Sequence, residues 1–351
     1  MHPYEKFADS HFWSRSVALR SASEIDYDPA PKFVFRIADD RFATAGSCFA
    51  QHFGRALVER GGHLLVSETR HPIIHEANAH GYGIFSARYG NLYTTRQLRE
   101  LVQQAVGLQE TVFEFVQRPD MRWCDALRPR AVPDGFSSEP EAAADRRYHL
   151  RRVRDALSSC TVFVFTLGLT ESWTNRLYGH NYGICPGVIA GKFDPSIHEF
   201  HNLTLGECAD DLNSTFEILR GINKEIKILL TVSPVMLVAT AEKRGVLQSS
   251  IASKSILRAA ADECVRALSY VDYFPSYEMI TGPQARGIYF AEDLREVKEE
   301  GVQFVMNMFF KSRISDQPIP TKKEQATPEV NMLDLMQSHQ SDCDEAYLDN
   351  R

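Results

Sequence analysis

The sequence lacks the cysteine patterns that mark a disulfide scaffold or a structural zinc site. Its seven cysteines are odd in number and widely spaced, and no Cys-x-x-Cys pair occurs. Disulfide-rich domains are proteins of oxidising compartments, whereas unpaired, scattered cysteines are typical of reducing ones. We therefore expect a cytoplasmic protein without a metal centre.

Excess positive charge is also missing. The chain has 39 Lys and Arg residues against 46 Asp and Glu, a formal net charge of -7. A mildly acidic chain without a basic cluster is poorly suited to hold a phosphate backbone, so no nucleic-acid partner is expected. Neither G-x-x-x-x-G-K-[ST] nor G-x-G-x-x-G occurs, which removes the support for nucleotide chemistry, and no cofactor is expected.

Long hydrophobic runs are absent as well. The longest apolar stretches, such as the one around Phe163, have the length of a strand and are too short to span a bilayer. The first residues, MHPYEKFADSHFW, show no charged-then-apolar signal pattern. We expect no membrane insertion.

What is present is an alternation of strand-like and helix-like segments. Residues 160–167 and 226–233 are unbroken apolar runs, as in strands covered on both faces. Amphipathic helical patterns surround them, at residues 48–60, 96–106, 146–157, 207–220, 253–268 and 299–310. Such alternation predicts a single α/β domain, a three-layer sandwich with a mostly parallel, flavodoxin-like sheet.

The flanks and two internal stretches are less regular. Residues 1–40 are interpreted as an arm packed on the domain, residues 41–311 as the domain, and residues 312–351, which are polar and charged, as a disordered tail. Residues 107–145 contain four prolines and predict an excursion over the surface. Residues 174–206 are rich in Gly, Pro, His and Asn, and their aromatic residues favour an ordered loop.

The sharpest local motif is Gly46-Ser47-Cys48-Phe49-Ala50, at the start of a predicted helix. A serine there lies at the positive end of the helix dipole, where an oxyanion is stabilised. The alternative for Ser47 is an ordinary helix cap. Cys48 is a rival nucleophile, although a cysteine one residue into a helix usually faces inward.

These five residues spell the motif of the GSCFA family, and the resemblance covers roughly residues 3 to 311. It includes the stretches Tyr89-Gly90-Asn91-Leu92-Tyr93, Phe165-Thr-Leu-Gly-Leu-Thr-Glu-Ser-Trp173, Leu230-Thr-Val-Ser-Pro-Val235 and Ser253-Lys254-Ser255. The family resembles a branch of the SGNH hydrolases. The resemblance implies a bacterial-type serine esterase or O-acyltransferase with Ser47 as its nucleophile, acting on a small-molecule or carbohydrate acyl ester.

By the same resemblance, other stretches would line the site. Gly90 matches the glycine that gives an N–H group to the oxyanion hole, and Gly168 matches the glycine of a third block. The SGNH pattern places an asparagine after that third glycine, and this chain has Leu, Thr and Glu instead. Asn91 or Thr170 could take its place, and Cys48, Glu171 and His201 complete the expected substrate-binding set.

The catalytic base is the point where the chain departs from the pattern. SGNH enzymes carry Asp-x-x-His near the last helix, and here Asp293 matches the Asp while Glu296 stands at the His position. Glu296 would then serve as the base, or a loop histidine would replace it, with His201 the first candidate. The alternative function is a non-catalytic carbohydrate-binding or accessory protein of polysaccharide biosynthesis that keeps the pocket.

Lys254 allows a further interpretation. Its place beside Ser253 is similar to the Ser-Lys nucleophile pairs, but capping and solvation of an amphipathic helix explain it about as well.

Overall fold

A five-stranded parallel sheet forms the centre of the computed structural model, which describes residues 2–70, 81–316 and 344–348. Its strands are β1 (Arg41–Gly46), β2 (His63–Leu64), β5 (Val162–Leu167), β9 (Lys227–Val232) and β10 (Val271–Tyr273). They lie in the order β10-β9-β5-β1-β2, and every pairing is parallel. Counted along the chain this is the 2-1-3-4-5 order of flavodoxin-like sheets. The predicted fold class is confirmed.

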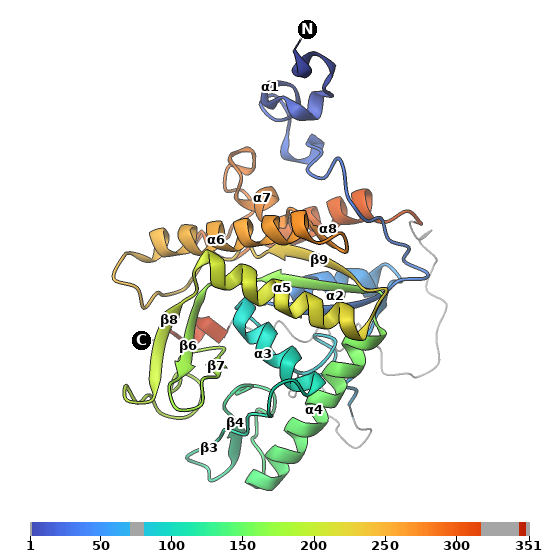
Figure 1. The fold of residues 1–351 in the computed structure, drawn as a ribbon. Helices are drawn as coiled ribbons and strands as arrows, with labels where there is room; N and C mark the ends of the chain where they lie inside the picture. Colours follow the sequence, from blue (N-terminus) through green and yellow to red (C-terminus); the bar gives the residue numbers. More distant parts are fainter. Residues whose placement is uncertain (1, 71–80, 317–343, 349–351) are drawn as a thin grey trace.

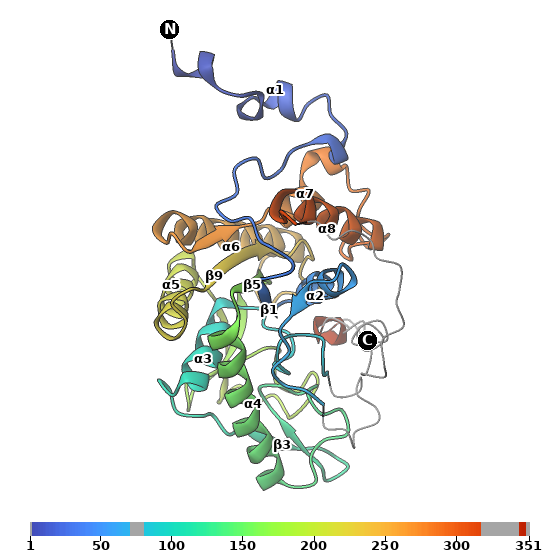
Figure 2. The same cartoon turned by 90° about the vertical axis from the view of Figure 1, so that its right-hand side faces the viewer.

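Helices cover both faces of the sheet (Figures 1 and 2). Because neighbouring strand residues point to opposite faces, Phe163 and Phe165 belong to one core cluster, and Val162 and Val164 to the other. The first cluster includes side chains of α3 (Thr95–Val106), α4 (Glu139–Ser159), α5 (Leu205–Ile222) and α6 (Val246–Ala267). The second includes those of α2 (Phe49–Glu59), α7 (Ser276–Thr281) and α8 (Glu299–Arg313).

Residues 174–206, interpreted from the sequence as a loop, are more regular than expected. Their strands β7 (Asn181–Tyr182) and β8 (His198–Asn202) pair antiparallel with β6 (Glu171–Asn175). Strand β8 reads His-Glu-Phe-His-Asn and has no apolar alternation, so its strand state depends on its partner rather than on its own pattern. A second small pair, β3 (Phe115–Gln117) with β4 (Trp123–Asp125), lies in the excursion.

The arm and the end of the last helix meet at the edge of the domain. Phe35 is fully buried, its N–H donates to the carbonyl of Arg313 at 2.7 Å, and it forms a parallel bridge with Ile314. Arg313 is itself buried and pairs with Asp28 and Asp272 at 2.5 Å. Nearer the N-terminus, the short helix α1 (Trp13–Ser16) buries no residue, and Figure 1 shows it projecting from the body.

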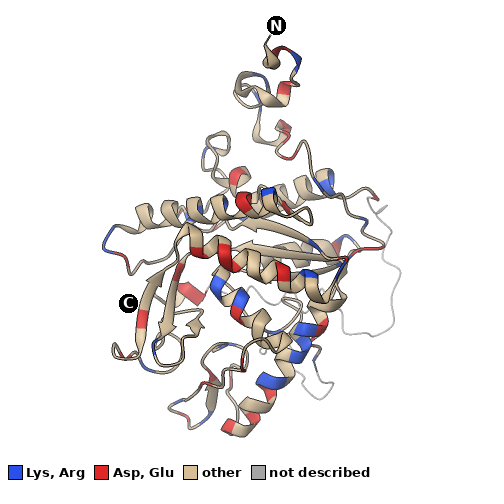
Figure 3. Ribbon diagram, viewed as in Figure 1, with Lys and Arg blue, Asp and Glu red and all other residues tan. Residues whose placement is uncertain are grey.

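Buried ion pairs attach the proline-rich excursion to the domain. Arg128, in the excursion, pairs with Asp125 at 2.9 Å and with Asp145 of α4 at 2.8 Å. In the same network Glu68 accepts a 2.7 Å hydrogen bond from His149, and both side chains are fully buried. The excursion is therefore held in a defined position. Figure 3 shows acidic and basic residues interspersed along α4.

This network predicts a loss of stability in mild acid. Burial lowers the pKa of His149 to about 4. Between about pH 6.5 and 4, the imidazole is therefore protonated in the unfolded chain but not in the folded chain. Burial would raise the pKa of Glu68, but His149 and the nearby arginines outweigh it and lower that pKa to about 2. Both groups therefore favour unfolding as the pH falls, His149 between about 6.5 and 4 and Glu68 below about 4.5. The urea midpoint should fall between pH 7 and pH 5.

The matched variant is His149→Gln, which keeps a donor for Glu68 and cannot titrate. Its urea midpoint should fall less than that of the wild type over the same pH range. The exposed His63 serves as the control position. Parallel acid slopes for the wild type and His149→Gln would contradict the assignment.

Candidate active site

Ser47 lies at the point where the strand order of the sheet reverses. It follows the last residue of β1, and Gly168 follows the last residue of the neighbouring β5. The order 2-1-3-4-5 reverses between these two strands, and ligands of open α/β sheets bind in the crevice outside the carboxyl ends of strands at such a point. The topology thus places Ser47 at the position where this fold class builds its sites.

Two glycines allow the strand ends to approach closely. Gly46 has φ +132°, and a Cβ added to it would lie 2.7 Å from the backbone nitrogen of Thr166 and closer still to its carbonyl oxygen. A Cβ on Gly168 would lie 2.9 Å from the carbonyl oxygen of Tyr93 and 3.2 Å from the Cβ of Ser47. Side chains at these positions would push Ser47 away from β5.

The hydroxyl group of Ser47 is buried without a hydrogen-bond partner among the described residues. The residue is 3% exposed. The N-cap of α2 is Cys48, and no side chain caps that helix, so the helix-cap interpretation of Ser47 is wrong. A buried hydroxyl that makes no hydrogen bond costs free energy, and such a group needs an explanation other than stability.

Ser47 borders a small cavity of about 10 Å³. It is lined by Ser47, Cys48, Tyr93, Gly168, Leu169, Ser233, Val235, Leu237, Lys254 and Glu345. Of the residues predicted from the sequence, the structure brings Ser47, Cys48 and Gly168 together here. Ser233 lies in the Leu230–Val235 stretch of the family resemblance but was not among the predicted site residues.

Lys254 is the basic side chain of this cavity. It is 2% exposed on α6, and its Nζ donates to the carbonyl oxygen of Gly168 at 2.5 Å. Capping and solvation, the ordinary interpretation of this lysine, do not fit a buried amine. The signal in the sequence was its place in Ser253-Lys254-Ser255, together with the Ser-Lys pairing that the residues allow.

The segment before α3 reaches the same strand ends. The N–H of Leu92 donates to the carbonyl oxygen of Gly46 at 2.8 Å, which fixes this segment beside β1. Asn91 is 7% exposed, and its Nδ2 donates to Asp344 at 3.0 Å. Gly90 has φ +69° and is exposed, with nothing within 4 Å of an added Cβ, so its glycine serves the turn.

Thr170 and Glu171 are bound to other parts of the fold. The hydroxyl group of Thr170 donates to Asn202 at 2.6 Å, and the residue is fully buried. Glu171 is the first residue of the strand β6. It accepts hydrogen bonds from Thr240 and Ala241, and burial raises its pKa. Neither residue lines the cavity of Ser47.

The expected catalytic partners are not brought to Ser47. Asp293 and Glu296 are exposed and do not line its cavity, and Asp293 accepts hydrogen bonds from the N–H groups of Arg295 and Glu296 at 3.0 Å. His201, the first alternative, lies on β8 and pairs with Glu207 at 2.7 Å. No histidine is among the described residues that line the cavity, and His71, His75 and His80 lie outside the described residues.

The residues Asp344–Leu348 form a short 3-10 helix on this site, here called the C-terminal segment. Asp344 contacts Asn91, and Glu345 lines the cavity of Ser47. The sequence predicted a disordered tail over residues 312–351. Residues 312–316 and the C-terminal segment are ordered against the domain, while residues 317–343 and 349–351 lie outside the described residues.

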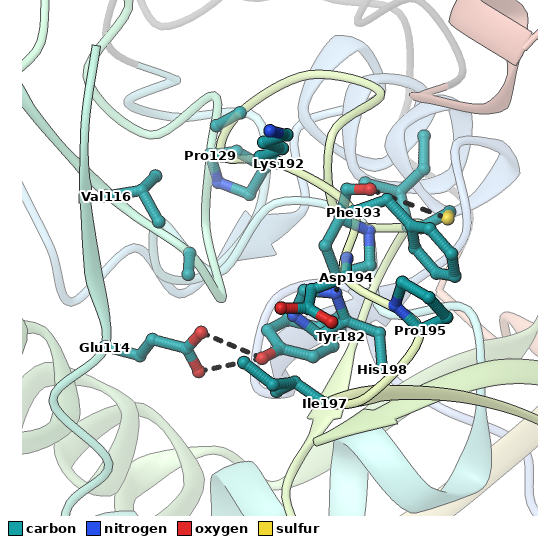
Figure 4. A pocket seen from close by; sticks show the side chains of 16 residues that line it. Glu114, Val116, Pro129, Tyr182, Lys192, Phe193, Asp194, Pro195, Ile197 and His198 are labelled. Carbon is teal, nitrogen blue, oxygen red and sulfur yellow. Dashed lines mark hydrogen bonds between the residues drawn. The ribbon is translucent and has the colours of Figure 1, made fainter. Parts of the chain in front are cut away.

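A larger cavity of about 480 Å³ lies between the excursion and the small sheet β7-β6-β8 (Figure 4). Tyr182 and Phe193 contribute aromatic surface to it, and Lys192, Asp194 and His198 contribute polar groups. Glu114 accepts hydrogen bonds from Tyr182 at 2.8 Å and from His180 at 2.5 Å, which lower its pKa against the effect of burial.

This cavity adjoins the segment of Asn91. Ile184 and Cys185 line it, and an added Cβ on Gly183, the residue before them, would lie 3.8 Å from the carbonyl oxygen of Asn91. On its other side Pro129 lines it, and the next residue, Arg130, pairs with Asp344 at 3.1 Å.

Neither a metal cluster nor a membrane span is found in the part of the chain that the structure describes. No group of three or more His, Cys, Asp or Glu side chains there is placed to hold a metal ion. No described helix combines the length and apolar character that crossing a bilayer requires.

Comparisons with known proteins identify the family. Among solved structures, the chain is similar to a family 3 carbohydrate esterase of Clostridium thermocellum, with 10% identity over 78% of this chain and 94% of that chain and a TM-score of 0.26. None of the curated proteins matches the sequence. The model of the GSCFA family matches residues 41–309, most of the chain and nearly all of the domain. The resemblance first drawn from Gly46–Ala50 is thereby confirmed, and the chain belongs to the GSCFA family.

Proposed function

We propose that this protein is a serine esterase or O-acyltransferase of the SGNH type, with an acyl ester of a carbohydrate as its substrate. The observation that carries the proposal is the hydroxyl group of Ser47, which is buried and unpaired among the described residues at the switch point of the sheet. It shares its cavity with the amine of Lys254. Nucleophile and base side chains that face one cavity are the arrangement that acyl transfer through a covalent intermediate requires.

Ser47 would attack the acyl carbonyl and Lys254 would act as the base. The neutral amine of Lys254 takes the proton of the Ser47 hydroxyl, and the resulting ammonium gives it to the departing alcohol, which leaves an acyl-serine. Water or a second alcohol then releases the acyl group by the reverse sequence. Lys254 replaces Glu296 in this role because Glu296 is exposed to solvent and does not border the cavity.

The oxyanion would form at the start of α2. This helix begins at Phe49, two residues after Ser47, and the positive end of its dipole stabilises negative charge there. The N–H groups of Ser47 and Gly168 already donate to the carbonyl oxygens of Thr166 and Tyr93, at 3.1 and 3.0 Å. The helix end and the ammonium of Lys254 would therefore supply the stabilisation that the N–H group of Gly90 was expected to give.

The non-acyl part of the substrate would occupy the 480 Å³ cavity. Its mixture of aromatic faces and polar groups suits a sugar ring, which has apolar faces and a hydroxyl-bearing rim. Tyr182 lines this cavity, and Phe193, which also lines it, packs against Trp173 at 5.4 Å between ring centroids.

The proposal predicts a large effect of Lys254→Met. Hydrolysis of short-chain aryl esters and O-acetylated sugars by the full chain should fall by about 100-fold or more, because general-base catalysis contributes roughly 10²–10⁴-fold. Lys254→Arg should fall similarly, since an arginine keeps the charge but does not deprotonate. The exposed Lys243→Met serves as the control. Full activity in Lys254→Arg would assign the lysine an electrostatic role only.

The alternative function is non-catalytic carbohydrate binding. The small size of the 10 Å³ cavity around Ser47, which no described imidazole lines, favours it. The two functions separate by assay: a binding protein would retain sugars in the large cavity and would hydrolyse no ester, with or without Ser47.

A further inference from the structure

We propose that Asn91, Tyr93 and Arg130 form a subsite for a carboxylate group of the substrate, and that the C-terminal segment occupies this subsite and closes the site in the free protein. The inference deepens the proposed function, because it names the chemical class of the substrate as a carboxylate-bearing sugar ester. It stands on the contacts of Asp344 and Glu345 with residues beside Ser47.

Both oxygens of the Asp344 carboxylate are held by the domain. Oδ1 accepts from Nη1 of Arg130 at 3.1 Å, and Oδ2 accepts from Nδ2 of Asn91 at 3.0 Å. The Tyr93 hydroxyl lies 3.5 Å from Oδ2 and accepts from the N–H of Asp344 at 2.9 Å. A charged donor and a neutral donor on separate oxygens match the shape of a planar carboxylate.

Glu345, the next residue, also pairs with an arginine of the domain. Its carboxylate lies 3.6 Å from Arg295, whose Nε donates to the carbonyl oxygen of Met236 at 3.0 Å. Residue Glu345 is 9% exposed and lines the cavity of Ser47. Two successive acidic residues are thus placed against two arginines from distant parts of the chain. Figure 1 shows the segment in red near the start of α3, and Figure 3 shows its acidic residues.

The segment also contributes to the small size of the site. Glu345 is one of the ten residues around a cavity of about 10 Å³, which is the space of a single water molecule. A space of that size does not hold an acyl ester, and Glu345 forms part of its wall. A substrate must therefore displace the segment, and a ligand that takes over the contacts of Asp344 would do so at the lowest cost.

A carboxylate fits the subsite better than a neutral group does. Asn91 is 7% exposed and the side chain of Arg130 is 34% exposed, so the subsite is partly removed from water. A neutral group in place of Asp344 would give up the charge-assisted contacts that the carboxylate makes with Arg130 and Asn91. The subsite therefore discriminates by charge, and a uronate-type sugar supplies the charge on the ring itself.

The test measures binding, which does not depend on catalysis. The probes are methyl β-glucuronide and methyl β-glucoside, which differ by the carboxylate, titrated calorimetrically into the full-length chain. In Asp344→Asn/Glu345→Gln the glucuronide should bind at least about 10-fold more tightly than in the wild type, where the segment competes. It should also bind about 10-fold more tightly than the glucoside, and Arg130→Met in the same background should remove that preference. The exposed Asp210→Asn is the control.

Equal affinity of the double variant for the two sugars would overturn the carboxylate subsite. Equal glucuronide affinity in the wild type and the double variant would overturn the occupation by the segment. The ester assay adds an independent arm: a faster rate in the double variant supports closure, whereas a slower rate would show that the two acidic residues belong to the catalytic machinery. Binding without any ester hydrolysis would leave the subsite standing and refute the proposed esterase instead.

Discussion

Ser47→Ala is expected to abolish ester hydrolysis while leaving the fold intact or slightly more stable. Loss of a nucleophile removes the covalent route, and the rate should fall on the order of 10⁴-fold or more. Stability, unlike activity, is not expected to fall, because the Ser47 hydroxyl is buried and makes no hydrogen bond within the described residues. Replacing an unsatisfied buried hydroxyl by a methyl group should raise the free energy of unfolding by about 1 kcal/mol or leave it unchanged.

The two measurements are the initial rate on aryl esters and the urea midpoint, taken on the same preparation. A serine that only supported the fold would show the reverse pattern, with lowered stability and unchanged rate. Cys48→Ala is the matched control, because Cys48 borders the same cavity and is the rival nucleophile. Activity that survives Ser47→Ala and disappears in Cys48→Ala would assign the chemistry to the thiol.

Gly46→Ala is expected to be the most destabilising single change near the site. The new Cβ would lie inside the contact distance of the Thr166 backbone, on the neighbouring strand, and the residue would have to keep φ at +132°. Steric overlap in a packed core and a disfavoured backbone conformation together should lower the free energy of unfolding by about 4 kcal/mol. The melting temperature of a domain of this size would fall by about 8 °C.

Gly61→Ala is the control that measures the cost of the positive φ without the steric overlap. Gly61 also has positive φ, +79°, but nothing lies within 4 Å of an added Cβ. This substitution should lower the free energy of unfolding by only about 1 kcal/mol, which is the cost of holding an alanine in the left-handed conformation. If the two variants were equally stable, the close approach of β1 and β5 at Gly46 would not be as tight as the structure has it.

The central strands β5 and β9 could be predicted because they carry their own signal. Strand β5 is buried at all six positions and reads Val-Phe-Val-Phe-Thr-Leu, an unbroken apolar run. Strand β8 could not be predicted, since four of its five residues are polar and its structure comes from pairing with β6. An apolar run predicts a buried strand, whereas a strand that is stabilised by pairing with its neighbours need not show any such pattern.

The candidate site shows the same division. Gly168 follows a predicted strand, and Ser47 stands in a motif whose family is confirmed, so both could be singled out from the sequence. Lys254 lies on a helix far along the chain, and only the packing of α6 against the sheet brings it to the cavity that Ser47 borders. Asp293 and Glu296 match a motif by spacing, but spacing does not fix the distance to another strand, and both remain at the surface.

The bridge between Phe35 and Ile314 has a consequence for how this chain can be connected. The two residues enclose the whole α/β domain. The backbone of Phe35 donates to Arg313 at 2.7 Å and accepts from Ser315 at 3.0 Å, the residues on either side of Ile314. The ends of the domain therefore coincide in space, as in proteins that tolerate circular permutation. A short peptide could join these ends and new termini could open in an exposed loop such as that around Lys243, leaving every strand with its present neighbours. The order in which the elements are synthesised is thus separable from the architecture that they form.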